Sequence, residues 1–581
     1  MSRGGRWQVG LRREAQRFLL LLLVVCGVLS GLAAVVFHGA LAGAESLLLS
    51  SARGLPAGPW RSAALLLLPI AVGAALCTLV PRFAPQAGGG LSLVRGAYAR
   101  DPRRLSGRTL GGTFLATPLS LGAGVPLGPE GPTVVLTSGI SVALARALQL
   151  PPRVVRGMIP VGTAAGIAAI FNTPITGVVF ALEEVIGTAS RGVLGGAIVA
   201  AVAAAVVQKQ LLGGAHLLPA APGAWRSAPE LIGFALLGVV AGVAAGALPR
   251  AVRRLRALRR PARRPLDDAA RGALAGAYVG LLGLLSPDAL GIGYPVISRF
   301  LDGGGSAGEA GLAFAVKFAA VALALATPLV GGVFAPSLFL GASVGAALGH
   351  AIHDLFPNAV IDPGAYALVG MGAFFAGFLR TPIASVLIVF ELTGDYGLVA
   401  PLMLAVVLAS VVARRLSPAT LVEQQLESEG VSADAGADPL AQLRARDVMS
   451  APPICLLADE RAAQAWQRVS GHSHRVYPVV DTAGLLLGLI DREALAGAAA
   501  NSSAGEPVGQ RMYSARVLAT PDEPLDRVSL RLGAAGETRC AVVESPERPR
   551  VLGVLTPGDL LRARLRASVA AADATFRGLT G

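Results

Sequence analysis

The sequence predicts an all-α polytopic membrane protein, built from inverted repeats of broken helices and followed by a cytoplasmic α/β module. Three observations predict this fold class: an apolar composition, an internal repeat within the apolar part, and a change of texture near residue 428. Of the 581 residues, 53% are hydrophobic and only 15% are charged, and the mean hydropathy is +0.62. These values exclude an ordinary water-soluble fold.

The charge balance is strongly basic. The chain has 50 basic and 36 acidic residues, a formal net charge of +14, and only Lys209 and Lys317 are lysines. In a chain this apolar, positively charged cytoplasmic loops explain the excess better than a nucleic-acid partner does. The densest basic cluster lies midway, at residues 250–264. We therefore expect a protein of the cell (inner) membrane whose N-terminus, central loop and C-terminal region are cytoplasmic.

Residues 1–428 form the expected membrane domain. An apolar run at residues 18–36 follows five arginines, and it is too long for the core of a secretory signal, so it predicts a first membrane helix. Many later apolar segments are interrupted by Gly and Pro and are too short to cross a bilayer alone. Such broken helices are tolerated only where protein packs around them or where they line a watery path.

An internal repeat divides this domain into halves at roughly residues 18–215 and 228–428. In the first half, ATPL leads to LGPEGPTVVLTSG and then to FNTPITGVVFALEEVIG; in the second, ATPL leads to GGVFAPSLFLGAS and then to FLRTPIASVLIVFELTG. Gly128 aligns with Gly332, and Glu183 aligns with Glu391. Repeats of this kind are typical of transporters, whose substrate site lies at the repeat interface. A purely architectural duplication is the alternative.

The paired motifs GPEGP and GVFAP predict an anion site. Each indicates a tight turn into a helix, because glycine permits unusual dihedral angles and proline suits a first helical turn. Each helix start leaves free N–H groups. Two such starts aimed at one another would bind a small anion without fixed cations, so we expect a permeating anion rather than a cation.

Glu130, in the middle of GPEGP, is a candidate gate because a carboxylate in a membrane is costly. Ionised, it would occupy the anion site as a surrogate anion; protonated, it would swing clear. The alternative is a first-turn glutamate that stabilises the helix dipole at a water-exposed end.

Glu183 and Glu184 end an apolar segment, and successive helical residues point about 100° apart, so only one of them should face a given path. A second buried carboxylate is what a proton route to Glu130 would require. Solvated residues at a helix end are the alternative.

With these motifs in this order, residues 18–426 resemble the CLC family of chloride channels and proton-coupled chloride transporters. The resemblance implies that Glu130 is the gating glutamate, and that the FNxP segment at residues 171–174 places the proton-transfer glutamate at Glu184. It also implies a homodimer with a complete pore in each subunit. The backbone amides of the G-x-F-x-P motif would bind the anion, here at Gly332, Val333, Phe334 and Ala335.

The sequence departs from the family pattern at three positions. The serine that helps to bind the central anion is replaced by Gly89, and the central tyrosine aligns with Ala419. Pro129 replaces the usual basic residue beside the gate, which removes one positive charge. The first two changes remove anion ligands, so they put anion selectivity and tight proton coupling in question.

After a polar linker at residues 429–442, the C-terminal part resembles a tandem pair of CBS modules, at residues 443–500 and 508–567. In the second module GVLTPGDL places Thr556 and Asp559 where such modules hold a nucleotide's ribose and phosphate; in the first, the same frame has Asp491 and then Ala494. The resemblance implies an adenine nucleotide as a ligand. A dimerisation role without a ligand is the alternative.

The sequence therefore predicts a non-enzyme of the lipid bilayer that moves chloride or a similar monovalent anion, with protons as the coupled ion. The alternatives are a passive, pH-gated chloride channel, a nucleotide-regulated membrane sensor and a magnesium transporter. No metal site and no required cofactor are expected: the four cysteines are scattered, and the pair His472 and His474 has no further ligand nearby in the sequence.

Overall fold

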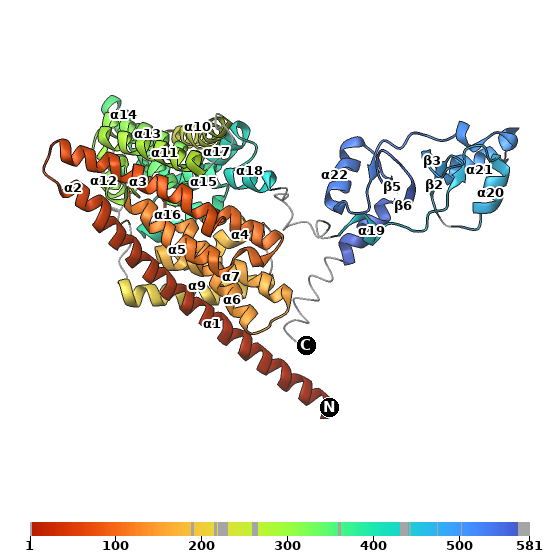
Figure 1. The fold of residues 1–581 in the computed structure, drawn as a ribbon, viewed down its shortest axis with the longest axis horizontal. Coiled ribbons are helices and arrows are strands. Elements are labelled where there is room, and N and C mark those ends of the chain that lie inside the picture. Colours follow the sequence, from red (N-terminus) through yellow and green to blue (C-terminus); the bar gives the residue numbers. More distant parts are fainter. Residues whose placement is uncertain are drawn as a thin grey trace. The chain divides into compact units, whose positions relative to one another are not determined.

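The structure is a computed structural model that describes residues 3–187, 191–213, 218, 230–257, 265–357, 362–394, 396–429, 440, 443–472, 474–500 and 502–566. The chain forms two compact units, residues 1–433 and 434–577 (Figure 1). Most of the predicted linker at 429–442, the loop part of the basic cluster at 258–264, the junctions near 215 and 228, and residue 567 lie outside the described residues.

The described residues of the first unit form helices that are joined by turns and loops. Its first half comprises α1 (Arg3–Glu45), the π-helix η1 (Ser46–Ser50), α2 (Ser51–Gly54), α3 (Pro59–Phe83), α4 (Gly90–Ala99), the 3₁₀ turn η2 (Pro102–Arg104), α5 (Gly107–Gly122), α6 (Glu130–Ala147), α7 (Pro152–Phe171), α8 (Pro174–Phe180), the π-helix η3 (Ala181–Ile186) and α9 (Arg191–Leu212). Its second half comprises α10 (Glu230–Ala257), α11 (Pro265–Leu285), the 3₁₀ turn η4 (Pro287–Ala289), α12 (Tyr294–Leu301), α13 (Ala307–Ala326), α14 (Phe334–Leu355), α15 (Pro363–Leu379), α16 (Pro382–Thr393), α17 (Val399–Leu416) and α18 (Leu421–Ser428).

Long and broken helices alternate in this unit. The described residues include eight helices that are long and apolar enough to cross a membrane. Between them lie short helices such as α4, α8 and α12, with ten, seven and eight residues, which cannot span a hydrocarbon core. Several helices begin at a proline, whose fixed φ suits the first turn. The predicted fold class, an all-α membrane unit with broken helices, is confirmed.

The two halves hold one another through reciprocal helix caps. The carboxylate of Glu391 on α16 accepts the backbone N–H groups of Ile175 and Thr176 at the start of α8, at 3.0 and 2.6 Å. In the other direction, Glu183 accepts the N–H groups of Ile383 and Ala384 at the start of α16, at 3.2 and 2.9 Å. Each carboxylate satisfies free donors and complements the positive end of a helix dipole. Glu183 is therefore a structural cap.

The two halves also match at the residues that end α7 and α15, and their spacing differs by one residue further on. Asn172 and Arg380, which end α7 and α15, both adopt the left-handed conformation, at φ 56° and 62°. From Thr173 to the glycine that ends the segment there are fourteen steps, whereas the matching stretch from Thr381 has thirteen. The π-helix η3 accommodates the extra residue in the first half. Counted from Thr173 and Thr381, Glu183 matches Glu391 and Glu184 matches Leu392, so Glu184 has no glutamate counterpart in the second half.

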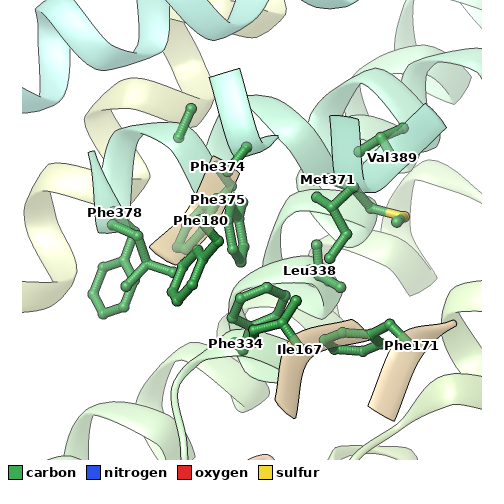
Figure 2. Close-up of a cluster of buried hydrophobic side chains, with 14 of the residues drawn as sticks. Ile167, Phe171, Phe180, Phe334, Leu338, Met371, Phe374, Phe375, Phe378 and Val389 are labelled. Carbon is green, nitrogen blue, oxygen red and sulfur yellow. The ribbon is translucent and has the colours of Figure 1, made fainter. Parts of the chain in front are cut away.

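Aromatic side chains from both halves form the core next to the repeat interface (Figure 2). The ring of Phe334, at the start of α14, lies 5.0 Å from Phe171, 5.5 Å from Phe180 and 4.3 Å from Phe375. These rings come from α7, α8 and α15, so one side chain ties the start of α14 to three other helices. Edge and offset contacts between aromatic rings stabilise the fold in addition to the stabilisation from burying their apolar area.

Close helix crossings use glycine. Helices α3 and α11 lie side by side, and the backbones of Gly73 and Gly272 are in contact where they cross (Figure 1). A side chain at either position would overlap the opposite backbone. Small residues allow this approach in membranes, where van der Waals packing drives helix association.

The second unit consists of two small α/β modules of the same design. The first contains β1 (Leu456–Leu457), α20 (Ala462–Val469), β2 (Val476–Val480), β3 (Leu486–Asp491) and α21 (Arg492–Ala500); the second contains β4 (Leu518–Ala519), α22 (Leu525–Ala535), β5 (Cys540–Val543) and β6 (Val551–Leu555). The short helix α19 (Ala445–Val448) precedes both. In each three-stranded sheet, the first pair is parallel and the second antiparallel.

The two modules exchange their leading segments. The stretch before the first module pairs with the second, through bridges from Arg444 to Pro524 and from Ser450 to Val554. Conversely, Val508, which leads into the second module, is buried in the core of the first. The modules therefore depend on one another for complete hydrophobic cores.

Candidate anion site between the repeats

The two turns predicted to face one another meet directly. The backbone N–H of Gly128 donates to the carbonyl of Gly332 at 2.8 Å, and the N–H of Gly332 donates to the carbonyl of Gly128 at 2.5 Å. The two hydrogen bonds are reciprocal, because each glycine donates to and accepts from the other, as expected where two equivalent segments meet. Helices α6 and α14 begin two residues further on, at Glu130 and Phe334. Their N-termini therefore lie on either side of one small region.

Glycine is required at this meeting point. A Cβ on Gly332 would come within 2.8 Å of the backbone nitrogen of Gly131, and a Cβ on Gly131 would lie 3.3 Å from the Cα of Gly332. A Cβ on Gly128 would overlap the carboxylate of Glu130. The glycines of both motifs thus let two backbones and one carboxylate share a space too small for added side chains.

Glu130 is fully buried and lies at this region. Its Oε1 accepts a hydrogen bond from the hydroxyl of Tyr294 at 3.1 Å. The backbone of Ala335, in the first turn of α14, is beside the carboxylate. A carboxylate at the N-terminal ends of two helices occupies the place that their dipoles prepare for an anion. Tyr294 was not identified from the sequence, because it is 164 residues away from Glu130 along the chain.

A cavity of about 530 Å³ opens onto Glu130. Its wall includes the starts of α4, α6 and α14, with Gly89 and Gly131 among the lining residues. At another part of the wall lie charged groups, Arg104, Arg256 and Glu429. Arg104 pairs with Glu429 at 2.7 Å. The cavity therefore extends from these charged residues to the region between the helix starts.

The predicted anion ligands of the G-x-F-x-P motif differ in whether they line this cavity. Gly332, Val333 and Phe334 line it, while Ala335 is fully buried. Figure 2 shows the ring of Phe334 within the aromatic core, so only its backbone is available to an anion. The core contacts of this ring fix the backbone turn at the site.

Gly89 and Ala419 are the residues predicted to take the places of the family's serine and tyrosine. At Gly89 an added Cβ would lie 2.7 Å from the Cβ of Leu93, so a serine there would need the helix start to move. Ala419 is not among the lining residues; the next residue, Thr420, is. The Thr420 hydroxyl accepts the N–H of Glu423 at 3.1 Å as the cap of α18. Thr420 was not identified from the sequence, where Ala419 was the predicted ligand.

Glu184 is buried and faces the interior, as expected for one of the two adjacent glutamates. Its Oε1 lies 3.4 Å from Nη1 of Arg95 on α4, whose side chain is 17% exposed. Glu423 and Arg380 are the next charged groups of this cluster, and they pair with each other at 3.2 Å. Gly89 immediately precedes α4, and Arg95 lies on α4, so this short helix contacts both the cavity and Glu184.

In the second unit, the predicted nucleotide residues bond to protein groups. The Thr556 hydroxyl donates to the carboxylate of Asp559 at 2.7 Å, and Arg562 donates to its other oxygen at 2.7 Å. Asp491, from the first module, accepts hydrogen bonds from Arg539 and Tyr513. Thr556 and Asp559 therefore lie together, whereas Asp491 joins the two modules.

The fold and the site together define a polytopic membrane protein whose two repeats meet at paired helix N-termini. Residues 72–414 match the family model described as voltage gated chloride channel, and residues 445–501 match the CBS domain model. The chain therefore belongs to the voltage gated chloride channel (CLC) family and carries a CBS domain.

Two curated relatives come from bacteria. A ClcB-like chloride channel protein of Ralstonia nicotianae is 34% identical over 298 residues, which cover 51% of this chain and 69% of the relative. The H(+)/Cl(-) exchange transporter ClcA of Vibrio cholerae is 32% identical over 359 residues, covering 60% of this chain and 76% of the relative.

Solved structures agree in fold. A slow cyanobacterial Cl⁻/H⁺ antiporter is similar with a TM-score of 0.65 and 25% identity, covering 71% of this chain and 97% of the antiporter. A eukaryotic CLC transporter has a TM-score of 0.62 at 23% identity and covers 95% of this chain and 98% of its own, a likeness of fold alone. The family matches and these likenesses confirm the predicted membership and fold class.

Proposed function

We propose that this protein moves chloride or a similar monovalent anion across a membrane in exchange for protons, with Glu130 as the gate. The observation that carries the proposal is the position of the Glu130 carboxylate, at the meeting point of the helices α6 and α14 and at the wall of a cavity of about 530 Å³. The relatives whose names describe proton and chloride exchange support it.

The anion step follows from backbone dipoles. The first-turn N–H groups of α6 and α14 provide partial positive charge without a fixed cation, so an anion can bind and still leave. An ionised Glu130 competes for the same place and blocks it. When Glu130 takes up a proton, it loses that attraction, moves aside and lets an anion enter.

The proton step uses Glu184. This carboxylate is buried and lies on a different element from Glu130, so protons need not follow the anion's entire path. Its ion pair with Arg95 holds it in one orientation. In the exchange mechanism, protons reach Glu184 from the side of the protein where Arg95 lies. Glu184 then passes them to Glu130, and the same route can run in reverse.

The second candidate function is a passive, pH-gated chloride channel. The observation that favours it is the presence of Gly89 in the cavity wall, because a glycine has no hydroxyl to hold a central anion. An anion that is held weakly at the centre can pass without waiting for a proton. A magnesium path would need clustered membrane carboxylates, whereas Glu130 and Glu184 lie on separate elements, α6 and η3.

The test is a flux measurement on the purified full chain in liposomes. A chloride gradient is imposed, and chloride efflux and proton movement are recorded together for the wild type, Glu130→Gln and Glu184→Gln. Uphill proton movement that both substitutions abolish supports the exchanger. Chloride flux without coupled protons in the wild type makes the protein a channel. No anion flux at all contradicts both candidate functions.

The protein lies in a bilayer as a homodimer, with its N-terminus and C-terminal modules in the cytoplasm. Exposed apolar side chains such as Leu115, Ile232 and Leu274, each at least 66% exposed, are suited to contact lipid tails. Crosslinking of the membrane-embedded protein tests the dimer, and protease access from either side tests the orientation.

The CBS pair binds an adenine nucleotide through Thr556 and Asp559. Thr556 bonds to Asp559, and Arg562 bonds to the same carboxylate, so the threonine and the aspartate lie next to each other. A nucleotide whose ribose and phosphate bind these two side chains needs this arrangement. Calorimetry with ATP and with Asp559→Asn tests this role. Binding that changes no anion flux would favour a nucleotide sensor on a membrane scaffold.

A further inference from the structure

The loop that leads into α12 is held by two cations. The guanidinium of Arg53 donates to the carbonyl of Pro287 at 2.6 Å. The ammonium of Lys317, on α13, donates to the carbonyls of Ala289 and Gly291 at 3.0 and 2.6 Å. These contacts fix the backbone of the loop immediately before Tyr294, the residue that donates to Glu130.

Lys317 is fully buried, and in a membrane protein such a charge is costly unless its contacts compensate for it. A third carbonyl, of Ile292, lies 3.4 Å from its Nζ. The ammonium also lies over the ring of Phe339 on α14, 4.6 Å from the centroid. Lys317 therefore joins the loop to α13 and to the helix that begins at the candidate anion site.

Gly293 leaves the loop little freedom at its last residue. Its φ of +89° is in the region that favours glycine. An added Cβ would lie 2.6 Å from the Phe339 ring and 3.5 Å from Nζ of Lys317. The backbone that enters Tyr294 is thus enclosed by the same lysine and the same ring.

The charged groups around this loop are few among the described residues. Arg53 and Lys317 bind carbonyls, and Asp288 pairs with Arg299 at 3.5 Å. Helix α4, whose start lines the same cavity as Glu130, carries Arg95, which is paired with Glu184. Tyr294 is the side chain whose hydroxyl reaches the Glu130 carboxylate, at 3.1 Å.

We propose that Tyr294 is a latch that holds the Glu130 carboxylate in the anion path, and that Lys317 is a positioning residue that aims this latch. The inference rests on the proposed function of Glu130 as a gate. A hydrogen bond from a hydroxyl to an ionised carboxylate is stronger than one to the neutral acid. The latch therefore stabilises the blocked state and raises the proton concentration that is needed to open it.

The first experiment measures chloride efflux from liposomes against pH for the full-length wild type and Tyr294→Phe. We expect the variant to reach half-maximal flux at about tenfold lower proton concentration, that is, at higher pH, because a hydrogen bond to a charged group is worth about that factor or more. Tyr366→Phe is the matched control: Tyr366 is a buried tyrosine stacked on Phe234, and it is not among the residues that line the cavity at Glu130. It should keep the wild-type profile.

Two comparisons separate a latch from a merely structural tyrosine. In a Glu130→Gln background, adding Tyr294→Phe should produce no further shift, because no carboxylate remains to be held. Lys317→Met should shift the profile in the same direction as Tyr294→Phe, and the double variant should shift no further than Tyr294→Phe alone. If Lys317→Met does not fold, Lys317→Gln, which keeps a hydrogen-bond donor, replaces it.

An unchanged pH profile in Tyr294→Phe would overturn the latch, and additive shifts in the double variant would overturn the positioning role of Lys317. A shift that persists in the Glu130→Gln background would also overturn the latch. These outcomes differ from failure of the proposed function, in which the wild type itself shows no anion flux.

Discussion

The two halves of the membrane unit share a scaffold but differ in chemistry. Each half has a glycine turn before a helix, a left-handed residue before a Thr-Pro start, and a glutamate that caps a helix of the other half. At equivalent positions of the two turns, however, the first half has Glu130 and the second has Phe334. One points its carboxylate into the site, and the other packs its ring into the core.

A similar difference occurs one motif later. Glu183 and Glu391 are equivalent caps, but the residue that follows the cap is Glu184 in the first half and Leu392 in the second. The second half thus provides anchorage and backbone donors, and the first provides both titratable groups. The repeat therefore sets the geometry of the site, whereas differences at two equivalent positions, Glu130 against Phe334 and Glu184 against Leu392, set its chemistry.

The largest expected effect separates the adjacent glutamates. Glu184→Gln should reduce coupled proton movement to background while chloride flux continues, because it removes the buried carboxylate that has no equivalent in the second half. Glu183→Gln is the matched control: it should weaken the capping of α16 but keep the ratio of protons to chloride. Paired flux recordings measure both. Loss of coupling in Glu183→Gln alone would contradict the assignment.

The second prediction concerns the equivalent of the gate. Phe334→Ala should destabilise the membrane unit by about 3–5 kcal/mol, because it removes a buried ring that contacts rings of three helices. Denaturant unfolding in detergent measures this loss. Phe83→Ala is the control, since that side chain is 71% exposed; an equal loss in both variants would show that the aromatic core does not anchor the turn.

The third prediction tests the equivalence of the caps. Glu391→Gln and Glu183→Gln should each lower the free energy of unfolding by about 1–3 kcal/mol. In each variant an amide NH₂ group would lie near backbone N–H groups that now donate hydrogen bonds to a carboxylate. Similar losses in the same unfolding assay support a common structural role. A loss confined to one variant would show that the halves are not equivalent at this point.

The smallest effect is expected between the two modules of the second unit, which are also two copies of one design with different chemistry. Arg539 pairs with Asp491, but these side chains are 26% and 43% exposed. Arg539→Met should therefore destabilise the full chain's second unit by only about 0–1 kcal/mol. Thermal unfolding of the full chain, with the exposed Arg516→Met as a control, measures it. A much larger loss would show that this pair holds the modules together.

Much of this arrangement was predictable from local sequence. The Gly and Pro motifs predicted the two helix starts, because these residues determine backbone conformation within a few positions. The alignment of the halves predicted that Glu183 and Glu391 are equivalent. The one-residue difference in spacing after the Thr-Pro starts was also visible in the sequence, and it indicates the π-helix that carries Glu184.

The partners of the two carboxylates were not predictable in this way. Tyr294 and Arg95 approach Glu130 and Glu184 from segments 164 and 89 residues away, so only the packing of helices brings them together. Lys317 gave a signal that could have been used, since a lysine within an apolar helix marks a functional position by default. Its carbonyl partners in the loop before Tyr294 become evident only in three dimensions.

Chloride binding tests most directly whether Glu130 acts as a surrogate anion at the paired helix starts. Calorimetric titration of chloride into the purified full chain compares the wild type with Glu130→Ala at a pH where the carboxylate is ionised. The variant should bind chloride at least about tenfold more tightly, a gain of about 1.4 kcal/mol, because the competing carboxylate is gone. Equal affinity in the two proteins would contradict the account.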